Sequence, residues 1–125
     1  MRTHYRDIDA FITRDGSEIR ELMHPSRHDV SHQSLAEATV PPGGRTLLHH
    51  HTRTEELYFI LQGQGRMTLG DDEFDVMAGD TVCIAPGTAH RIVNSGQTAL
   101  KILCSCSPAY QDTDTVLLED SVQTP

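Results

Sequence analysis

Three consecutive histidines, His49, His50 and His51, are the residues of this sequence best suited to chemistry. They end a segment expected to be a β-strand, in which successive side chains point to opposite faces. His49 and His51 therefore share one face, where two parallel imidazoles can bind one ion. Taken alone, such a triplet is more often a solvated strand end, so further ligands must support the interpretation.

Two further side chains complete a candidate metal site. Glu56 opens the next expected strand, and His90 opens a later one after the turn at Pro86 and Gly87. Three neutral imidazoles and one carboxylate suit one divalent transition metal, whether Mn, Fe, Co, Ni, Cu or Zn. This set leaves one net positive charge and open coordination positions, so it predicts an anionic or oxygen-donor ligand.

The spacing of these residues resembles the two motifs of the cupins. The first motif is Gly, five residues, His-x-His, three or four residues, Glu, six residues and Gly, and the chain matches it from Gly43 to Gly63. The second is Gly, five residues, Pro-x-Gly, two residues, His, three residues and Asn. The chain matches it from Gly79 to Asn94, with Ala85 in place of the first proline.

The resemblance implies a small jelly-roll β-barrel with one metal inside it. The ligands would be the residues that match the motifs, namely His49, His51, Glu56 and His90. Cupins include dioxygenases, decarboxylases, isomerases and lyases as well as non-catalytic binding domains, and the fold does not choose among them. One hypothesis is a metalloenzyme of dioxygenase, isomerase or lyase type, acting on a small oxygenated or anionic substrate. The alternative is a non-catalytic cupin that binds a metal or a small ligand.

Side chains in phase with the ligands are candidates for substrate binding. Tyr58 and Ile60 share strand parity with Glu56, and Arg45 shares it with His49. Tyr58 is the candidate catalytic acid or base, and Arg45 could bind a substrate carboxylate. Each also has a structural interpretation: Tyr58 as a core residue of the barrel wall, and Arg45 as a solvated side chain.

The segments that must position these residues are short and separated by turns. The expected strands are 18–23, 33–40, 45–51, 56–62, 65–69, 73–77, 81–85, 90–94, 100–106 and 116–118, with one helical turn at 8–12. This pattern predicts an all-β, antiparallel jelly-roll barrel. We expect a single domain over 1–125, with a core barrel at about 34–107, N-terminal strands and a loop at 1–33, and a frayed tail at 119–125.

The composition and net charge disfavour several classes of binding partner. The 125 residues carry a net charge of −8, which disfavours nucleic acid and anionic membrane surfaces. No stretch approaches the ~20 apolar residues of a membrane span, and the N-terminus lacks the apolar core of a secretion signal, so we expect a cytoplasmic protein. The cysteines, Cys83, Cys104 and Cys106, are expected to be reduced. The Cys-x-Cys pair is interpreted as buried thiols, with a redox or metal element as the alternative.

Strand 56–62 is apolar on both faces, which predicts an assembly. Leu57 and Phe59 alternate with Tyr58 and Ile60. Two-sided apolarity means that the outer face is also covered. Segment 8–23 would cover part of it, and a second subunit would cover the rest. The sequence therefore predicts a homodimer.

Overall fold

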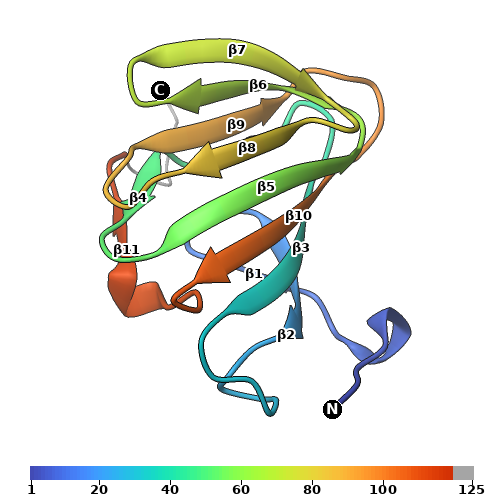
Figure 1. The fold of residues 1–125 in the computed structure, drawn as a ribbon. Helices are drawn as coiled ribbons and strands as arrows, with labels where there is room; N and C mark the ends of the chain where they lie inside the picture. Colours follow the sequence, from blue (N-terminus) through green and yellow to red (C-terminus); the bar gives the residue numbers. More distant parts are fainter. Residues whose placement is uncertain (120–125) are drawn as a thin grey trace.

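The computed structural model describes residues 1–119, and this part of the chain is almost entirely β-structure (Figure 1). Its strands are β1 (Phe11–Ile12), β2 (Glu18–Met23), β3 (Ser34–Val40), β4 (His49–His51), β5 (Glu55–Gln62), β6 (Gln64–Leu69), β7 (Asp72–Met77), β8 (Thr81–Ile84), β9 (His90–Asn94), β10 (Leu100–Ser107) and β11 (Thr115–Leu117). Two 3-10 helices, η1 (Tyr5–Asp7) and η2 (Asp112–Asp114), complete the described elements. The predicted all-β fold is confirmed.

The strands form two antiparallel sheets. The first has the order β1-β2-β3-β10-β5-β8, and the second has the order β11-β4-β9-β6-β7. From β3 onward consecutive strands lie in different sheets, apart from the β6–β7 pair, so the connections bring distant segments together, as expected of a jelly roll. The two sheets are not joined into one continuous hydrogen-bonded barrel, so the fold is a two-sheet jelly roll with its core between the sheets.

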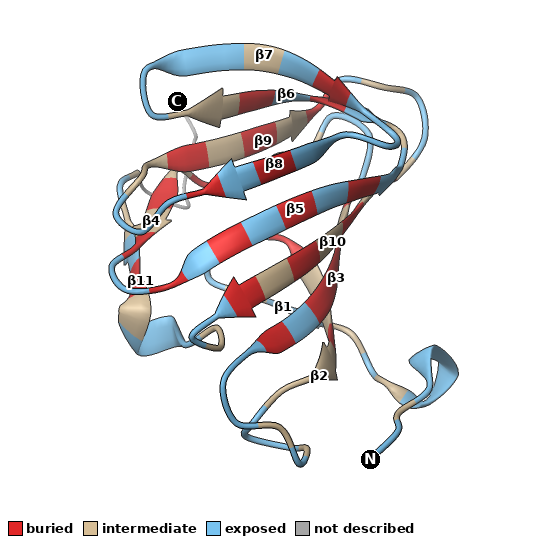
Figure 2. Cartoon of the chain, viewed as in Figure 1, coloured by how far each residue is buried: buried red, intermediate tan, exposed pale blue. Residues whose placement is uncertain are grey.

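Strand β5 shows how the sequence selects its inner face. Its residues alternate between exposed and buried from Glu55 onward, so that Glu56, Tyr58 and Ile60 point between the sheets (Figure 2). β10 lies between β3 and β5 and presents a matching buried set, from Leu100 to Cys106. Branched and aromatic side chains suit such a pleated, half-buried surface. The alternation therefore places a glutamate beside the apolar core.

The expected helical turn at 8–12 is wrong. The chain forms η1 earlier, where the His4 side chain accepts a hydrogen bond from the Arg6 amide. Phe11 and Ile12 then form β1, in which Phe11 pairs with Ile19 across a tight turn. This pairing gives the backbone of 11–12 partners that an isolated helical turn would lack.

The expected strand at 45–51 is shorter than predicted. Only His49–His51 is a strand, and Arg45 makes a single bridge with Val93. The backbone between them bonds elsewhere: the Thr46 amide donates to Ile92 and the Leu47 amide donates to the Asp15 carbonyl. These bonds hold the segment before the histidines against two other parts of the chain.

The remaining expectations concern the tail, the thiols and the membrane. The Glu119 side chain, expected to be in the frayed tail, accepts hydrogen bonds from the Leu48 amide and from Arg45 and Arg91; the rest of that tail, 120–125, lies outside the described residues.

All three cysteines are free thiols, as predicted. No helix within residues 1–119 has the length and apolar character to cross a membrane. Cytoplasmic location stays a prediction.

Candidate metal centre

The three motif histidines meet between the sheets. β4 carries His49 and His51 on its inner face, and β9 begins at His90, the register partner of His49. One ring nitrogen from each histidine lies within 4.8 Å of the other two. All three side chains are buried, and the rings of His49 and His90 are 4.2 Å apart between centroids. Convergence of three imidazoles at this spacing suits a metal ion.

A hydrogen bond at Nδ1 of each histidine determines the tautomer of the ring and so the state of its other nitrogen, Nε2. His49 Nδ1 lies 2.7 Å from the Leu47 carbonyl and His90 Nδ1 lies 2.9 Å from the Thr88 carbonyl. A carbonyl only accepts, so each Nδ1 carries the proton. His51 Nδ1 lies 3.0 Å from Thr115 Oγ1, whose own proton is donated to the Gln111 carbonyl. All three Nε2 atoms are therefore left with a lone pair, as metal ligands require.

Glu56 adjoins two of these nitrogens. Its Oε1 lies 3.3 Å from His51 Nε2 and 3.6 Å from His90 Nε2. Within the described chain, Glu56 Oε1 and His90 Nε2 are buried without any hydrogen-bond partner. Cys106 Sγ donates to the other oxygen, Glu56 Oε2, at 3.4 Å. Unpartnered buried polar atoms facing one another are the arrangement that a bound cation would satisfy.

Burial and proximity set the charges of the cluster. Burial, together with the neighbouring His90, lowers the pKa of His49 to about 4. Burial alone would raise the pKa of Glu56, but the adjacent His51 and His90 rings outweigh it and lower that pKa to about 2. At neutral pH His49 is therefore neutral and Glu56 is ionised. These are the protonation states in which the two groups bind a divalent metal.

The other predicted site residues take different places. Tyr58 lines the cavity beside the cluster, and burial raises its pKa well above 10, so its phenol stays protonated. Ile60 is 1% exposed and belongs to the hydrophobic core rather than to the cavity wall. Arg45 lies outside the cavity lining and pairs with Glu119 at 3.1 Å.

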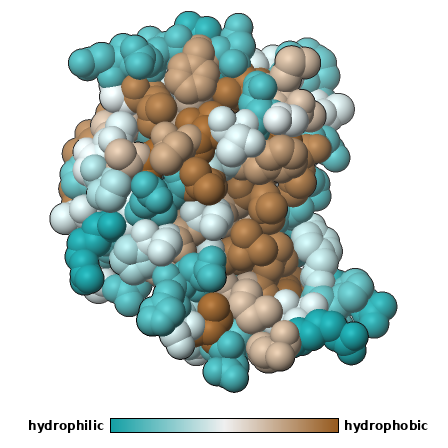
Figure 3. Space-filling view, viewed as in Figure 1, coloured by the Kyte–Doolittle hydropathy of each residue, from teal (hydrophilic) through white to brown (hydrophobic). Residues whose placement is uncertain are grey.

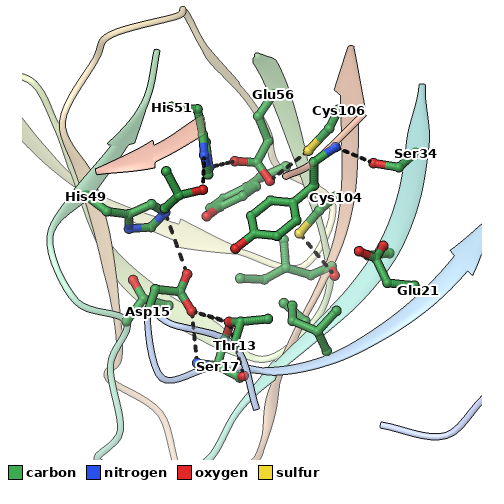
Figure 4. Close-up of a pocket in the computed structure, with 18 residues that line it drawn as sticks. Thr13, Asp15, Ser17, Glu21, Ser34, His49, His51, Glu56, Cys104 and Cys106 are labelled. Carbon is green, nitrogen blue, oxygen red and sulfur yellow. Dashed lines mark hydrogen bonds and ion pairs between the residues drawn. The ribbon is translucent and has the colours of Figure 1, made fainter. Parts of the chain in front are cut away.

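Sequence reasoning missed Asp15, which lies beside His49. Its Oδ2 is 3.6 Å from His49 Nε2 (Figure 4). Its other oxygen accepts hydrogen bonds from the hydroxyls of Thr13 and Ser17 and from the Ser17 amide. The dipeptide Asp15-Gly16 signals a turn between two strands, but only the three-dimensional structure places that turn over the cavity.

Glu21 was also missed, and it changes the charge of the cavity. It lies on β2, lines the same cavity as His49 and His51 and is 7% exposed. Asp15 and Glu21 thus add two carboxylates to the lining beyond the predicted ligand Glu56.

Comparison with known proteins agrees with this architecture. A family model described as a cupin domain matches residues 36–106. The chain is 51% identical to the uncharacterized protein MJ1618 of Methanocaldococcus jannaschii over 95% of each chain. It is 31% identical to the oxalate-binding protein of Thermotoga maritima, covering 72% of this chain and 77% of the relative.

A solved structure extends the likeness in fold. The polyketide cyclase RemF from Streptomyces resistomycificus superposes with a TM-score of 0.80 at 23% identity, over 97% of this chain and 87% of that one. The two-sheet jelly roll and its inner histidine cluster define a double-stranded β-structure with a candidate metal centre. The family match is specific, and the chain belongs to the cupins.

Proposed function

We propose that the chain binds one divalent transition metal through His49, His51, Glu56 and His90, and acts as a metalloenzyme on a small oxygenated molecule. The observation that carries the proposal is the common orientation of the three Nε2 lone pairs, each fixed by a hydrogen bond at Nδ1. Four protein ligands leave one or two positions open on an ion that accepts five or six. A metal there would polarise a bound oxygen atom.

Tyr58 and Cys106 support this role from the cavity wall. The Tyr58 phenol keeps its proton at neutral pH and is therefore a hydrogen-bond donor toward a bound molecule. Cys106 donates to Glu56 Oε2, which directs the other carboxylate oxygen toward the histidines. Ile60 is better explained as core, and Arg45 as the partner of Glu119, so neither enters the proposed substrate contacts.

Metal content tests the first half of the proposal. Metal-free protein is loaded separately with Mn(II), Fe(II) and Zn(II), and bound metal is measured by elemental analysis after dialysis. We expect one ion per chain for the native protein and for His50→Ala, because His50 lies on the opposite face of β4 from His49 and His51 and is not part of the three-histidine cluster. His51→Ala and His90→Ala should lose it. Equal metal content in all four proteins would contradict the site.

Turnover separates an enzyme from a binding protein. The Fe(II)- and Mn(II)-loaded proteins are tested for oxygen consumption and product formation with a keto acid, a sugar acid, catechol and oxalate. Oxalate is included because a relative is an oxalate-binding protein. Metal-dependent turnover that is lost in His90→Ala supports the enzyme. Binding without turnover favours the alternative, a non-catalytic ligand-binding cupin.

We also propose that the chain is a homodimer. The outer face of β5 exposes Leu57, Phe59 and Leu61, with Phe59 at 39%, and apolar side chains gather on the face seen in Figure 3. The N-terminal segment packs beside β3 rather than β5: β2 pairs with β3, and the Tyr5 hydroxyl donates to Glu37 at 2.7 Å. A second copy would cover the β5 surface, since closed two-fold pairs are the commonest homo-oligomers.

Light scattering at micromolar concentration tests the dimer. A mass of about twice 13.9 kDa is expected for the native chain. Phe59→Asp should shift it to the single-chain mass. Met77→Asp, which changes a still more exposed apolar residue on β7 of the other sheet, should leave it unchanged. A native mass near 13.9 kDa would refute the dimer.

A further inference from the structure

The cavity lining carries several carboxylates and, within the described chain, no lysine or arginine. The carboxylates are those of Asp15, Glu21 and Glu56. With one divalent cation at the histidines and all three carboxylates ionised, the cavity carries one net negative charge. A dicarboxylate ligand would add two more negative charges to a site partly shielded from water, where like charges repel strongly.

Of these three carboxylates, Glu21 is the one that lies away from the histidine cluster and has a buried oxygen without a hydrogen-bond donor. Its side chain is 7% exposed, and Oε1 makes no hydrogen bond to any described residue. The pairing of β2 with β3 shifts register between Glu21 and Met23, an irregularity of the kind that re-aims side chains. In Figure 4 the Glu21 carboxylate lies across the cavity from His49 and His51. A buried carboxylate oxygen without a donor is a site at which a ligand can donate a hydrogen bond.

The basic groups nearest to Glu21 do not reach the cavity. Burial raises the pKa of Glu21, and His24 and Arg27 offset this only in part. Neither residue lines the cavity, and the Arg27 guanidinium lies over the Phe11 ring, 5.7 Å from its centroid. A negatively charged ligand would therefore meet Glu21 without a cation to bridge them.

We propose that the cavity takes a small, uncharged, hydroxyl-bearing molecule, one hydroxyl of which donates a hydrogen bond to Glu21 while another of its oxygens binds at the histidine cluster. The inference rests on the proposed metal at that cluster and adds the chemical class of its ligand. Glu21 is thus a specificity-determining residue: it accepts a hydrogen bond from a ligand hydroxyl and repels carboxylates.

Matched ligand pairs test the role of Glu21. Glycerate and gluconate are each compared with their uncharged amides, which keep the size and the hydroxyl groups but remove the charge. Dissociation constants are measured on Mn(II)-loaded protein by water-proton relaxation, for the native chain, Glu21→Gln and Glu21→Ala. Glu18→Gln is the control, because it removes the same charge from an exposed position on the same strand.

We expect selectivity for amide over carboxylate to fall about tenfold or more in Glu21→Gln, which corresponds to about 1.4 kcal/mol. Carboxylate binding should tighten and amide binding should weaken. Glu21→Ala should follow the same direction, and Glu18→Gln should stay near native. The inference is overturned if selectivity is the same in native and Glu21→Gln protein, or if neither amide binds the native chain. Metal content is measured on every variant, because absence of metal from the native protein would instead refute the proposed function.

Discussion

The cavity has two walls that are held in different ways. The motif wall, made by His49, His51 and Glu56 with His90 packed against His49, is buried, and each of these histidines has an Nδ1 hydrogen bond to a backbone carbonyl or to Thr115. The N-terminal wall, made by Asp15 and Glu21, comes from the β1–β2 hairpin, and Glu21 Oε1 has no partner in the described chain. The motif wall presents histidine nitrogens and a carboxylate that suit one metal ion. The N-terminal wall instead has a carboxylate oxygen that is free to accept a hydrogen bond from a ligand. Metal binding and ligand choice are thus assigned to different parts of the chain.

The sharpest test of this division compares one carboxylate from each wall. Glu56→Gln removes a charged oxygen that faces two histidine nitrogens, so we expect metal affinity to fall about 100-fold or more. Asp15→Asn removes a carboxylate that faces His49 alone at 3.6 Å, and we expect a loss of about threefold. Chelator competition at neutral pH measures both. Equal losses would make Asp15 a metal ligand and remove the distinction between the walls.

Acid should act on the motif wall of the metal-free protein. The pKa of His49 is about 4 in the folded chain, below the ordinary 6.5 that it regains on unfolding. The unfolded state therefore binds the extra proton, and the free energy of unfolding should decrease as pH falls from 6.5 toward 4, by on the order of 3 kcal/mol. Below that range His49 adds no further dependence.

Urea unfolding at several pH values, with a chelator present, measures this dependence. His49→Gln should flatten the slope between pH 6.5 and 4. His50→Gln is the control, since its side chain lies outside the cavity. A native protein whose stability does not change over that interval would show that His49 titrates normally and that the motif wall is more open than its burial indicates.

Thr115 tests whether the motif wall depends on its hydrogen bonds. Thr115→Val keeps the side-chain shape but removes the oxygen that accepts the His51 Nδ1 proton. We expect metal affinity to fall about tenfold, since losing such a partner lets the ring and its tautomer vary. Thr113→Val, an exposed change in η2, is the matched control. An unchanged affinity in Thr115→Val would mean that strand packing alone orients His51.

The motif wall could be predicted because its information is local. Glu55 and Glu56 are adjacent, yet the spacing to Gly63 selects Glu56, and the structure buries Glu56 and exposes Glu55. Strand parity likewise separates His49 and His51 from His50, and the structure groups the first two with His90. Period-two alternation and motif spacing carry this information without knowledge of the rest of the fold.

The N-terminal wall could not be predicted because its position depends on long-range contacts. Asp15 reaches the cavity through a turn whose backbone carbonyl accepts a hydrogen bond from the Leu47 amide, over thirty residues away. Glu21 faces inward on a strand whose other residues are only partly buried, so no hydropathy pattern marks it. The helical turn expected at 8–12 failed for the same reason, because pairing of Phe11 with Ile19 decides the conformation.

The smallest expected effect on metal affinity comes from the Cys106 thiol, which contacts Glu56 of the motif wall. Cys106 Sγ donates to Glu56 Oε2 at 3.4 Å, whereas Cys104 Sγ donates to the Ile102 carbonyl at 3.8 Å. A thiol is a weak donor, so Cys106→Ala should weaken metal binding by only about threefold, and Cys106→Ser should restore it. Cys104→Ala should have no effect on metal affinity.

Burial raises the pKa of both Cys104 and Cys106, so neither is a reactive thiolate at neutral pH. Alkylation of the native protein, followed by mass spectrometry, should therefore modify only the exposed Cys83, and all three thiols should react after denaturation. Rapid alkylation of Cys106 in the native state would favour the redox interpretation of the Cys-x-Cys pair. It would also mean that the carboxylate of Glu56 is positioned by strand geometry alone, without the thiol.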